Sequence, residues 1–160
     1  MIKNILLIVL LIMIDQGTKL IIYKYFLDTR FDILPPIVEF YPKFNANYSY
    51  VLNDLLHMKL SGVLYVLLIL VMQILGIHMY IKQRKCTESF LLDFIFILFE
   101  AGYLSALCCV FFWEKGCWDF MYLKGLFIIF DLKDIYLTVF GFSLYIYLVK
   151  TNILDTKNCK

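Results

Sequence analysis

Residues 90–113 read FLLDFIFILFEAGYLSALCCVFFW, and this apolar stretch decides the fold. A helix needs about 20 predominantly apolar residues to cross the roughly 30 Å of hydrocarbon in a bilayer. Within lipid the backbone must satisfy its own hydrogen bonds, which a helix does inside one segment. The alternating polar pattern of a membrane barrel strand is absent from this stretch. It therefore predicts a transmembrane helix.

Three further stretches have the same character, at about 5–23, 60–81 and 134–149. Apolar residues make up 62% of the chain and the mean hydropathy is +0.81, whereas soluble domains contain about 45–50% apolar residues. A chain of 160 residues is too small to bury that much apolar surface in water. The composition excludes a soluble enzyme, a disordered chain and a nucleic-acid-binding protein. We predict one membrane domain over residues 1–160, an all-α bundle of four transmembrane helices.

The distribution of charge predicts the orientation of these spans. Basic residues dominate the link between the second and third spans and the two ends of the chain, at Lys82, Arg84, Lys85, Lys3, Lys150, Lys157 and Lys160. The links at 24–59 and 114–133 mix both signs. Because basic links stay in the cytoplasm, both termini are expected inside and both mixed links outside. The β-favouring run at 37–40 predicts a small extracytoplasmic β-containing element.

The five cysteines, Cys86, Cys108, Cys109, Cys117 and Cys159, form no CxxC pair, and neither His57 nor His78 lies near one in sequence. We therefore predict no metal site and no cofactor. Adjacent Cys108 and Cys109 are expected to act as small apolar side chains in the third span.

Placing an ionisable side chain inside a transmembrane span costs free energy, so such residues mark candidate functional sites. They are Asp15, Lys19, Asp93, Glu100 and Asp134. Asp15 and Lys19 are four residues apart on one helix face. They either join helices as an internal pair, with Lys19 extending outward to the membrane surface, or serve a function. Asp93 is expected to be a solvated or interfacial acid, and Glu100 to bond to a neighbouring helix. Asp134 either stabilises a helix N-terminus or is a catalytic carboxylate, which in an aspartic protease requires a second acid.

Several motifs, in order along the chain, resemble those of the lipoprotein signal peptidases (signal peptidase II). Residues 15–19 read DQGTK, similar to the family's DQxTK motif. Asn45 opens the run NANYSY, where the family has Asn before a Gly-Ala-Ala-Phe-like run. Residues 118–120 read WDF and residues 130–134 read FDLKD, similar to the family's Val-Asp-Phe and Phe-Asn-x-Ala-Asp motifs. The resemblance covers residues 4–149.

The resemblance implies an aspartyl endopeptidase that removes signal peptides from diacylated prolipoproteins. It places the protein in the bacterial inner membrane, in contact with the lipid bilayer. Asp134 matches one acid of the family's catalytic pair. The position of the other acid, on the third span, is taken by Cys109 in one alignment and by Val110 in another. Asp15, Lys19 and Asn45 are implied to be substrate-binding or structural polar residues.

Three functions remain open from the sequence. The chain is a divergent signal peptidase, a binder of lipidated or apolar helical peptides with impaired or lost catalysis, or an unrelated membrane scaffold. Glu114 or Asp119 could replace the missing acid if either approached Asp134. Without such a partner, Asp134 beside Lys133 is expected to stay ionised.

Overall fold

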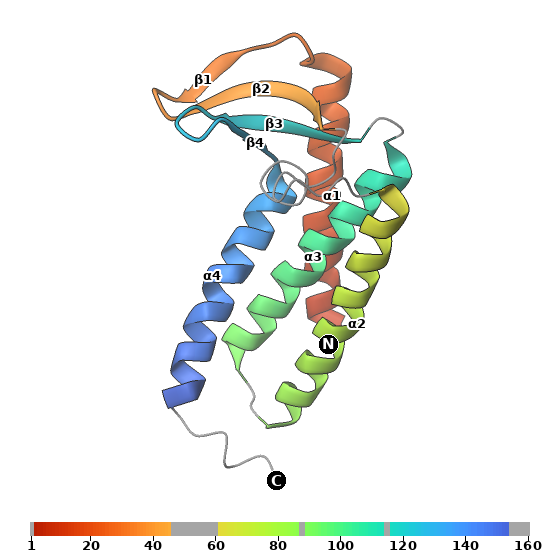
Figure 1. The fold of residues 1–160 in the computed structure, drawn as a ribbon, viewed down its shortest axis with the longest axis vertical. Coiled ribbons are helices and arrows are strands. Elements are labelled where there is room, and N and C mark those ends of the chain that lie inside the picture. The colour runs from red at the N-terminus through yellow and green to blue at the C-terminus, as the bar shows by residue number, and fades with distance from the viewer. Residues whose placement is uncertain (1, 46–60, 87–88, 114–115, 154–160) are drawn as a thin grey trace.

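Four long helices form a bundle in the computed structural model, which describes residues 2–45, 61–86, 89–113 and 116–153 (Figure 1). They are α1 (Ile2–Tyr25), α2 (Gly62–Cys86), α3 (Phe90–Phe112) and α4 (Leu132–Ile153). All four are long and apolar enough to cross a membrane, which confirms the predicted fold class. The helices also include polar residues at their ends. For example, α2 continues through the basic run that follows residue 81, since Lys, Gln and Arg are good helix formers.

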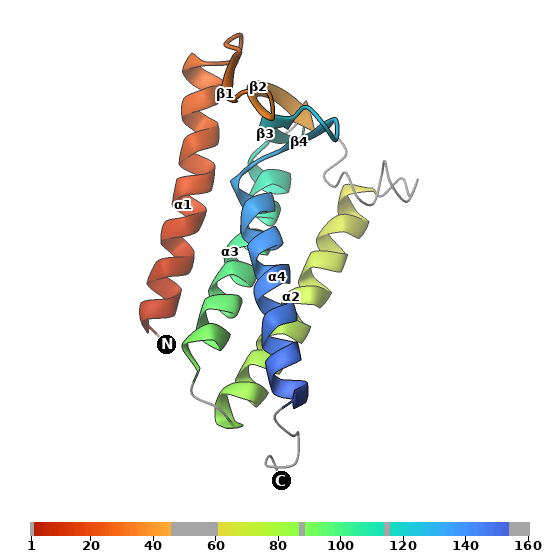
Figure 2. The same ribbon diagram turned by 90° about the vertical axis from the view of Figure 1, so that its left-hand side faces the viewer.

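A four-stranded antiparallel sheet lies across one end of the bundle (Figures 1 and 2). Its strands, in the order β1-β2-β3-β4, are β1 (Phe31–Leu34), β2 (Val38–Asn45), β3 (Cys117–Leu123) and β4 (Ile128–Phe130). The run at 37–40 predicts the start of β2 correctly. The other hairpin, β3–β4, comes from the second link and was not expected. Residues 46–60, which include most of the NANYSY run, lie outside the described residues.

The pairing of β2 with β3 joins the two links. Lys43 is opposite Asp119, and Asn45 is opposite Cys117. The register shifts between Phe40 and Lys43, around Pro42, whose missing N–H suits an irregular position in a strand. This register brings the end of β2 and the start of β3 together at the sheet–bundle junction.

Helix α3 packs against α1, α2 and α4, and it is the most buried of the four predicted spans. The outer faces of α1 and α2 expose many large aliphatic side chains, such as Leu6, Leu67 and Ile74. Such wide apolar surfaces are expected where a helix faces lipid rather than water. The chain enters α1 and leaves α4 at the end of the bundle opposite the sheet (Figure 2).

Two of the predicted intramembrane acids join helices. Tyr80 donates a hydrogen bond of 2.7 Å to Asp93, and Arg84 lies 3.4 Å from the same carboxylate. This pairing between α2 and α3 agrees with an interfacial acid. Glu100 faces Gln73 of α2, and with its nitrogen turned toward the acid, the Gln73 amide lies 3.0 Å from a carboxyl oxygen.

Gly76 allows α2 to approach α3. A Cβ atom at this position would overlap the ring of Phe99, and this ring is itself held between Tyr103 and Phe140. We expect Gly76→Ala to destabilise the protein by about 1–3 kcal/mol, the usual range for overpacking. The measurement is unfolding in detergent. Gly141→Ala is the control, because a Cβ there meets no atom within 4 Å, and an equal loss in both variants would contradict the prediction.

Candidate active site

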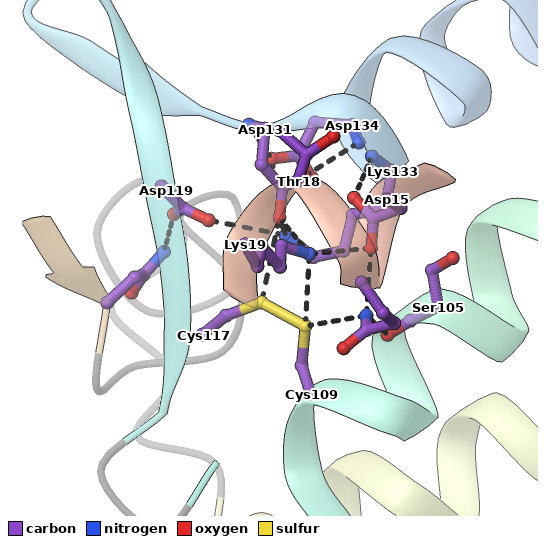
Figure 3. Close-up of polar contacts among 12 residues, drawn as sticks. Asp15, Thr18, Lys19, Ser105, Cys109, Cys117, Asp119, Asp131, Lys133 and Asp134 are labelled. Atoms are coloured by element: carbon purple, nitrogen blue, oxygen red, sulfur yellow. Dashed lines mark hydrogen bonds and ion pairs between the residues drawn. A yellow bond between two sulfur atoms is a disulfide. The ribbon is translucent and has the colours of Figure 1, made fainter. Parts of the chain in front are cut away.

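Buried charged residues gather where α1, α3, β3 and α4 meet (Figure 3). Asp15 and Lys19 of α1 are fully buried, and Lys19 Nζ lies 2.7 Å from Asp15 Oδ2. The same ammonium group lies 2.7 Å from Oδ2 of Asp131, which precedes α4 and is also fully buried. The predicted internal pair therefore extends to the start of a second helix. The expected outward extension of Lys19 is wrong, because two buried acids hold its ammonium group inside the protein. We call the whole group the polar cluster, and its members are Asp15, Lys19, Asn45, Asp119, Asp131, Lys133 and Asp134.

The first turn of α4 is capped by its own acids. Asp131 Oδ1 accepts the Asp134 backbone N–H at 3.2 Å, and Asp134 Oδ2 accepts the Asp131 backbone N–H at 3.1 Å. This reciprocal pattern is a capping box. Asp15 adds a third contact from α1, because its Oδ1 accepts the Lys133 backbone N–H at 3.2 Å. Asp134 thus has the helix-terminal role that the sequence offered as one alternative.

Lys133 lies between the three acids at this end of the bundle. Its Nζ is 2.7 Å from Asp131, 3.4 Å from Asp119 and 3.4 Å from Asp134. The Lys133 side chain is 4% exposed, whereas that of Asp134 is 40% exposed. A buried ammonium requires such compensation by acids. The sequence singled out Lys133 as a neighbour of Asp134 but not as the centre of the cluster.

Asp119 reaches the cluster from β3. Its Oδ2 accepts a hydrogen bond of 2.7 Å from the Asn45 side-chain amide, and its Oδ1 faces Lys133. Carboxylate oxygens of Asp119, Asp131 and Asp134 lie within 4.8 Å of one another. Of the two acids considered as replacements, Asp119 therefore approaches Asp134, while Glu114 lies outside the described residues. Asn45 is placed in the site through its bond to Asp119.

Cys109 differs from its expected role. It forms a disulfide with Cys117 that connects the end of α3 to the start of β3, so it is not merely a small apolar side chain. Lys19 Nζ donates to Cys109 Sγ at 3.3 Å. Val110, the other position considered for the missing acid, is partly buried. Neither position supplies a carboxylate on α3.

Gln16 is a further residue of the site, and the sequence analysis did not identify it as one. Its amide nitrogen donates to Asp15 Oδ2 at 2.8 Å, and its amide oxygen accepts from the Trp113 indole at 3.2 Å. Gln16 therefore orients Asp15 and connects α1 to the end of α3. Its place in the DQGTK motif was the available signal.

Asp119 and Asp131 lie outside the helices, and their pKa values are shifted in opposite directions. Burial opposes ionisation of Asp131, but the ammonium groups of Lys133 and Lys19 outweigh burial and hold the pKa of this carboxyl below its ordinary value. Burial raises the pKa of Asp119 from 3.8 to about 7, Lys133 opposes the rise, and the charges of Asp131 and Asp134 add to it. Asp119 is therefore the acid of this pair that holds a proton near neutral pH.

This raised pKa predicts a dependence of stability on pH. Between pH 4 and pH 7 folded Asp119 binds more protons than the unfolded chain, so the free energy of unfolding should fall as pH rises. The stabilisation is complete below about pH 4 and is lost as pH passes about 7. Denaturation of the native chain and of Asp119→Asn across this range measures the effect. A slope unchanged by the substitution would contradict it.

The carboxylates of Asp119, Asp131 and Asp134 are close enough to share a cation as ligands. Lys133 already places its ammonium against all three. A second donor set, formed by Cys109, Cys117 and Asp131, includes the two disulfide sulfurs and contacts Lys19. Thiolates rather than disulfide sulfurs bind metals. Protein ammonium groups thus contact both candidate donor sets.

The fold and the site define a multi-pass membrane protein with a buried polar cluster at the junction of helices and sheet. The family model of signal peptidase (SPase) II matches residues 7–150. The chain therefore belongs to the signal peptidase II family.

Solved structures agree at the level of the fold. A bacterial membrane enzyme solved by the in meso method at 1.9 Å resolution has a TM-score of 0.77 and 20% identity, over 92% of this chain and 93% of that chain. A second bacterial membrane enzyme, solved in the same way at 2.3 Å, has a TM-score of 0.78 and 21% identity, over 99% and 94%. No curated protein matches the chain.

Proposed function

We propose that this signal peptidase II family protein binds the lipidated signal-peptide segment of diacylated prolipoproteins and that its peptide-bond cleavage is impaired or lost. The carrying observation is the ammonium group of Lys133, which lies 3.4 Å from both Asp119 and Asp134. The family assignment supports the substrate class. The arrangement of the polar cluster supports the loss of catalysis.

An aspartic protease needs two carboxylates that share one proton and activate one water between them. Asp134 is the acid expected for one half of this pair, and its partly exposed side chain is accessible to a bound peptide. On α3, the position expected for the second acid holds Cys109 in its disulfide with Cys117, or Val110. The acids of α3 are Asp93 and Glu100, whose described partners belong to α2.

Asp119 is a poor replacement for the missing acid. Its side chain is 1% exposed, Asn45 donates to one of its oxygens, and Lys133 faces the other. A water that bridged Asp119 and Asp134 would have to compete with the Lys133 ammonium for the same oxygens. The ammonium also lowers the pKa of Asp119, against the larger rise caused by burial, and this opposes the sharing of a proton.

A second candidate function is cleavage by a displaced pair, Asp119 and Asp134. Its supporting observation is that their carboxylate oxygens lie within 4.8 Å of one another. The pKa of Asp119, raised by burial to about 7, suits an acid that holds a proton. This function requires Lys133 to move away when a peptide binds.

The proposal includes a location and an orientation. From the family assignment we infer that the protein lies in the bacterial inner membrane. We further infer that it is one membrane domain, with the sheet outside and both termini in the cytoplasm. The basic end of α2, with Arg84 and Lys85 in its last turn, supports this orientation by the positive-inside rule. The polar cluster then lies at the outer surface, where the signal peptide of an exported lipoprotein leaves the membrane.

Photo-crosslinking of the full chain in detergent tests the binding function. The probe is a diacylated prolipoprotein peptide with a photoreactive group beside its lipid-bearing Cys, and the same peptide without lipid is the competitor control. We expect saturable cross-linking that excess unlabelled diacylated peptide removes and unlipidated peptide does not. Asp134→Asn should retain it, since Asn preserves shape and capping. Equal competition by both peptides would contradict recognition of the lipid.

A further inference from the structure

The two hairpins of the sheet end in exposed apolar turns on the same side. The β1–β2 turn carries Leu34 and Ile37, which are 55% and 50% exposed, and the β3–β4 turn carries Leu126 and Phe127, which are 62% and 77% exposed. We call these four residues the hairpin tips. Both turns contain residue types that turns in water favour, Pro35–Pro36 and Gly125, but large exposed apolar side chains flank them. Large apolar side chains gathered at the tips therefore indicate an interaction surface.

The two tips are held together as one unit. The Lys124 backbone N–H donates to the Ile37 carbonyl oxygen at 3.0 Å, which connects one turn to the other. The Lys124 side chain contacts Asp32 of β1 and Glu39 of β2. These contacts raise the pKa of Lys124 and neutralise the cation nearest to the tips. Because two acids face this one cation, the surface beside the apolar tips is not basic.

The sheet lies at the level where a bilayer would end. Helix α1 has 24 residues, which at 1.5 Å per residue is about 36 Å, slightly more than the roughly 30 Å of hydrocarbon. The last turns of α1 reach the level of the sheet in both views (Figures 1 and 2). Tyr23 at this end packs against Trp113 and Trp118, with ring centroids 5.5 and 5.6 Å apart. Tyr and Trp are enriched at membrane interfaces.

We propose that the hairpin tips insert into the interfacial lipid layer of the leaflet on the sheet side. The tips continue a lipid-facing surface, because α4 follows β4 after one residue and exposes Ile135, Val139 and Phe142. The occupant of this surface is lipid at the boundary between headgroups and acyl chains, which accommodates apolar side chains close to a charged residue such as Lys124.

Insertion would set the height of the polar cluster relative to the membrane. Strands β2 and β3 carry Asn45 and Asp119, and the same two strands connect to the hairpin tips. A sheet anchored at its tips keeps these residues at a fixed depth. A peptide held in the membrane by its own lipid would then meet the cluster at a fixed position along its chain.

Fluorescence quenching in liposomes tests the insertion. The full chain carrying Phe127→Trp is reconstituted in phosphatidylcholine with brominated or unbrominated acyl chains, and the emission of the native chain, which has Trp113 and Trp118, is subtracted. We expect the added emission to be blue-shifted, mostly lost in brominated lipid and protected from aqueous iodide. Asp28→Trp is the control, because Asp28 is exposed beyond the end of α1, and it should be quenched mainly by iodide.

Two results would overturn the proposal. If iodide quenches Phe127→Trp as strongly as Asp28→Trp while brominated lipid does not, the tips lie in water. If neither quencher reaches Phe127→Trp, protein covers the tips, as in contact with a second copy. Leu126→Trp provides the same measurement on the same turn if Phe127→Trp does not fold.

Discussion

Replacing Asp131 with alanine is expected to lower the free energy of unfolding by about 3–5 kcal/mol, the usual loss when one partner of a buried ion pair is removed. Asp131 is fully buried and lies 2.7 Å from the ammonium groups of both Lys19 and Lys133. Its removal takes the 2.7 Å contact from both ammonium groups and the N-cap from α4. Lys19 keeps Asp15 as a partner, and Lys133 keeps only the 3.4 Å contacts with Asp119 and Asp134. Unfolding of the purified chain by denaturant in detergent measures the change.

Asp131→Asn separates the loss of the negative charge from the loss of the helix N-cap. Asparagine caps a helix as well as aspartate does, but it carries no charge for the lysines. We expect the Asn variant to lose less stability than the Ala variant, with the difference reporting the cap at about 1 kcal/mol. A loss below about 1 kcal/mol in both variants, the range of surface ion pairs, would contradict the description of the cluster.

The second large effect is expected from Lys133→Met, which removes the ammonium shared by three acids. Asp119 and Asp131 are at most 1% exposed, so their charges cannot be solvated in place of the lost contact. We expect a loss of about 3–5 kcal/mol near neutral pH, as for a broken buried pair. The loss should shrink as pH falls, because protonation removes the uncompensated negative charges. Unfolding measured at pH 5 and pH 8 tests both expectations.

Lys124→Met is the matched control for this substitution. Lys124 also contacts two acids, Asp32 and Glu39, but all three side chains are partly exposed. Exposed pairs are screened by water and contribute little. The control should therefore change stability much less than Lys133→Met. Similar losses in both variants, or a loss at Lys133 that does not vary with pH, would show that burial of the cluster is not the cause.

The sequence predicts the helices well, because each apolar segment is long enough to cross the hydrocarbon core of a bilayer. It also predicts the Asp15–Lys19 pair, since a spacing of four residues places both on one helix face. The cap of α4 also depends on residues close in sequence, because Asp131 and Asp134 are three residues apart at the start of the helix. These features depend on neighbours within a few positions of the chain.

The remaining part of the site depends on contacts between distant segments. Asp119 reaches the cluster only through the pairing of β2 with β3, which joins two separate links. A lysine near a helix end usually extends toward water, so the inward position of Lys133 was not expected from its place in the chain. The Cys109–Cys117 disulfide could not be deduced either, because spacing alone does not fix how cysteines pair.

The most direct test of the central claim is a single-turnover cleavage assay with the protein in excess over a diacylated prolipoprotein peptide. The native chain, Asp134→Asn and Asp119→Asn are compared under the detergent conditions in which cross-linking shows binding. We predict that all three leave the bound peptide intact over the same time course. Time-dependent cleavage by the native chain that is lost in Asp134→Asn would contradict the account. If Asp119→Asn also abolished this cleavage, the displaced pair of Asp119 and Asp134 would be the catalyst.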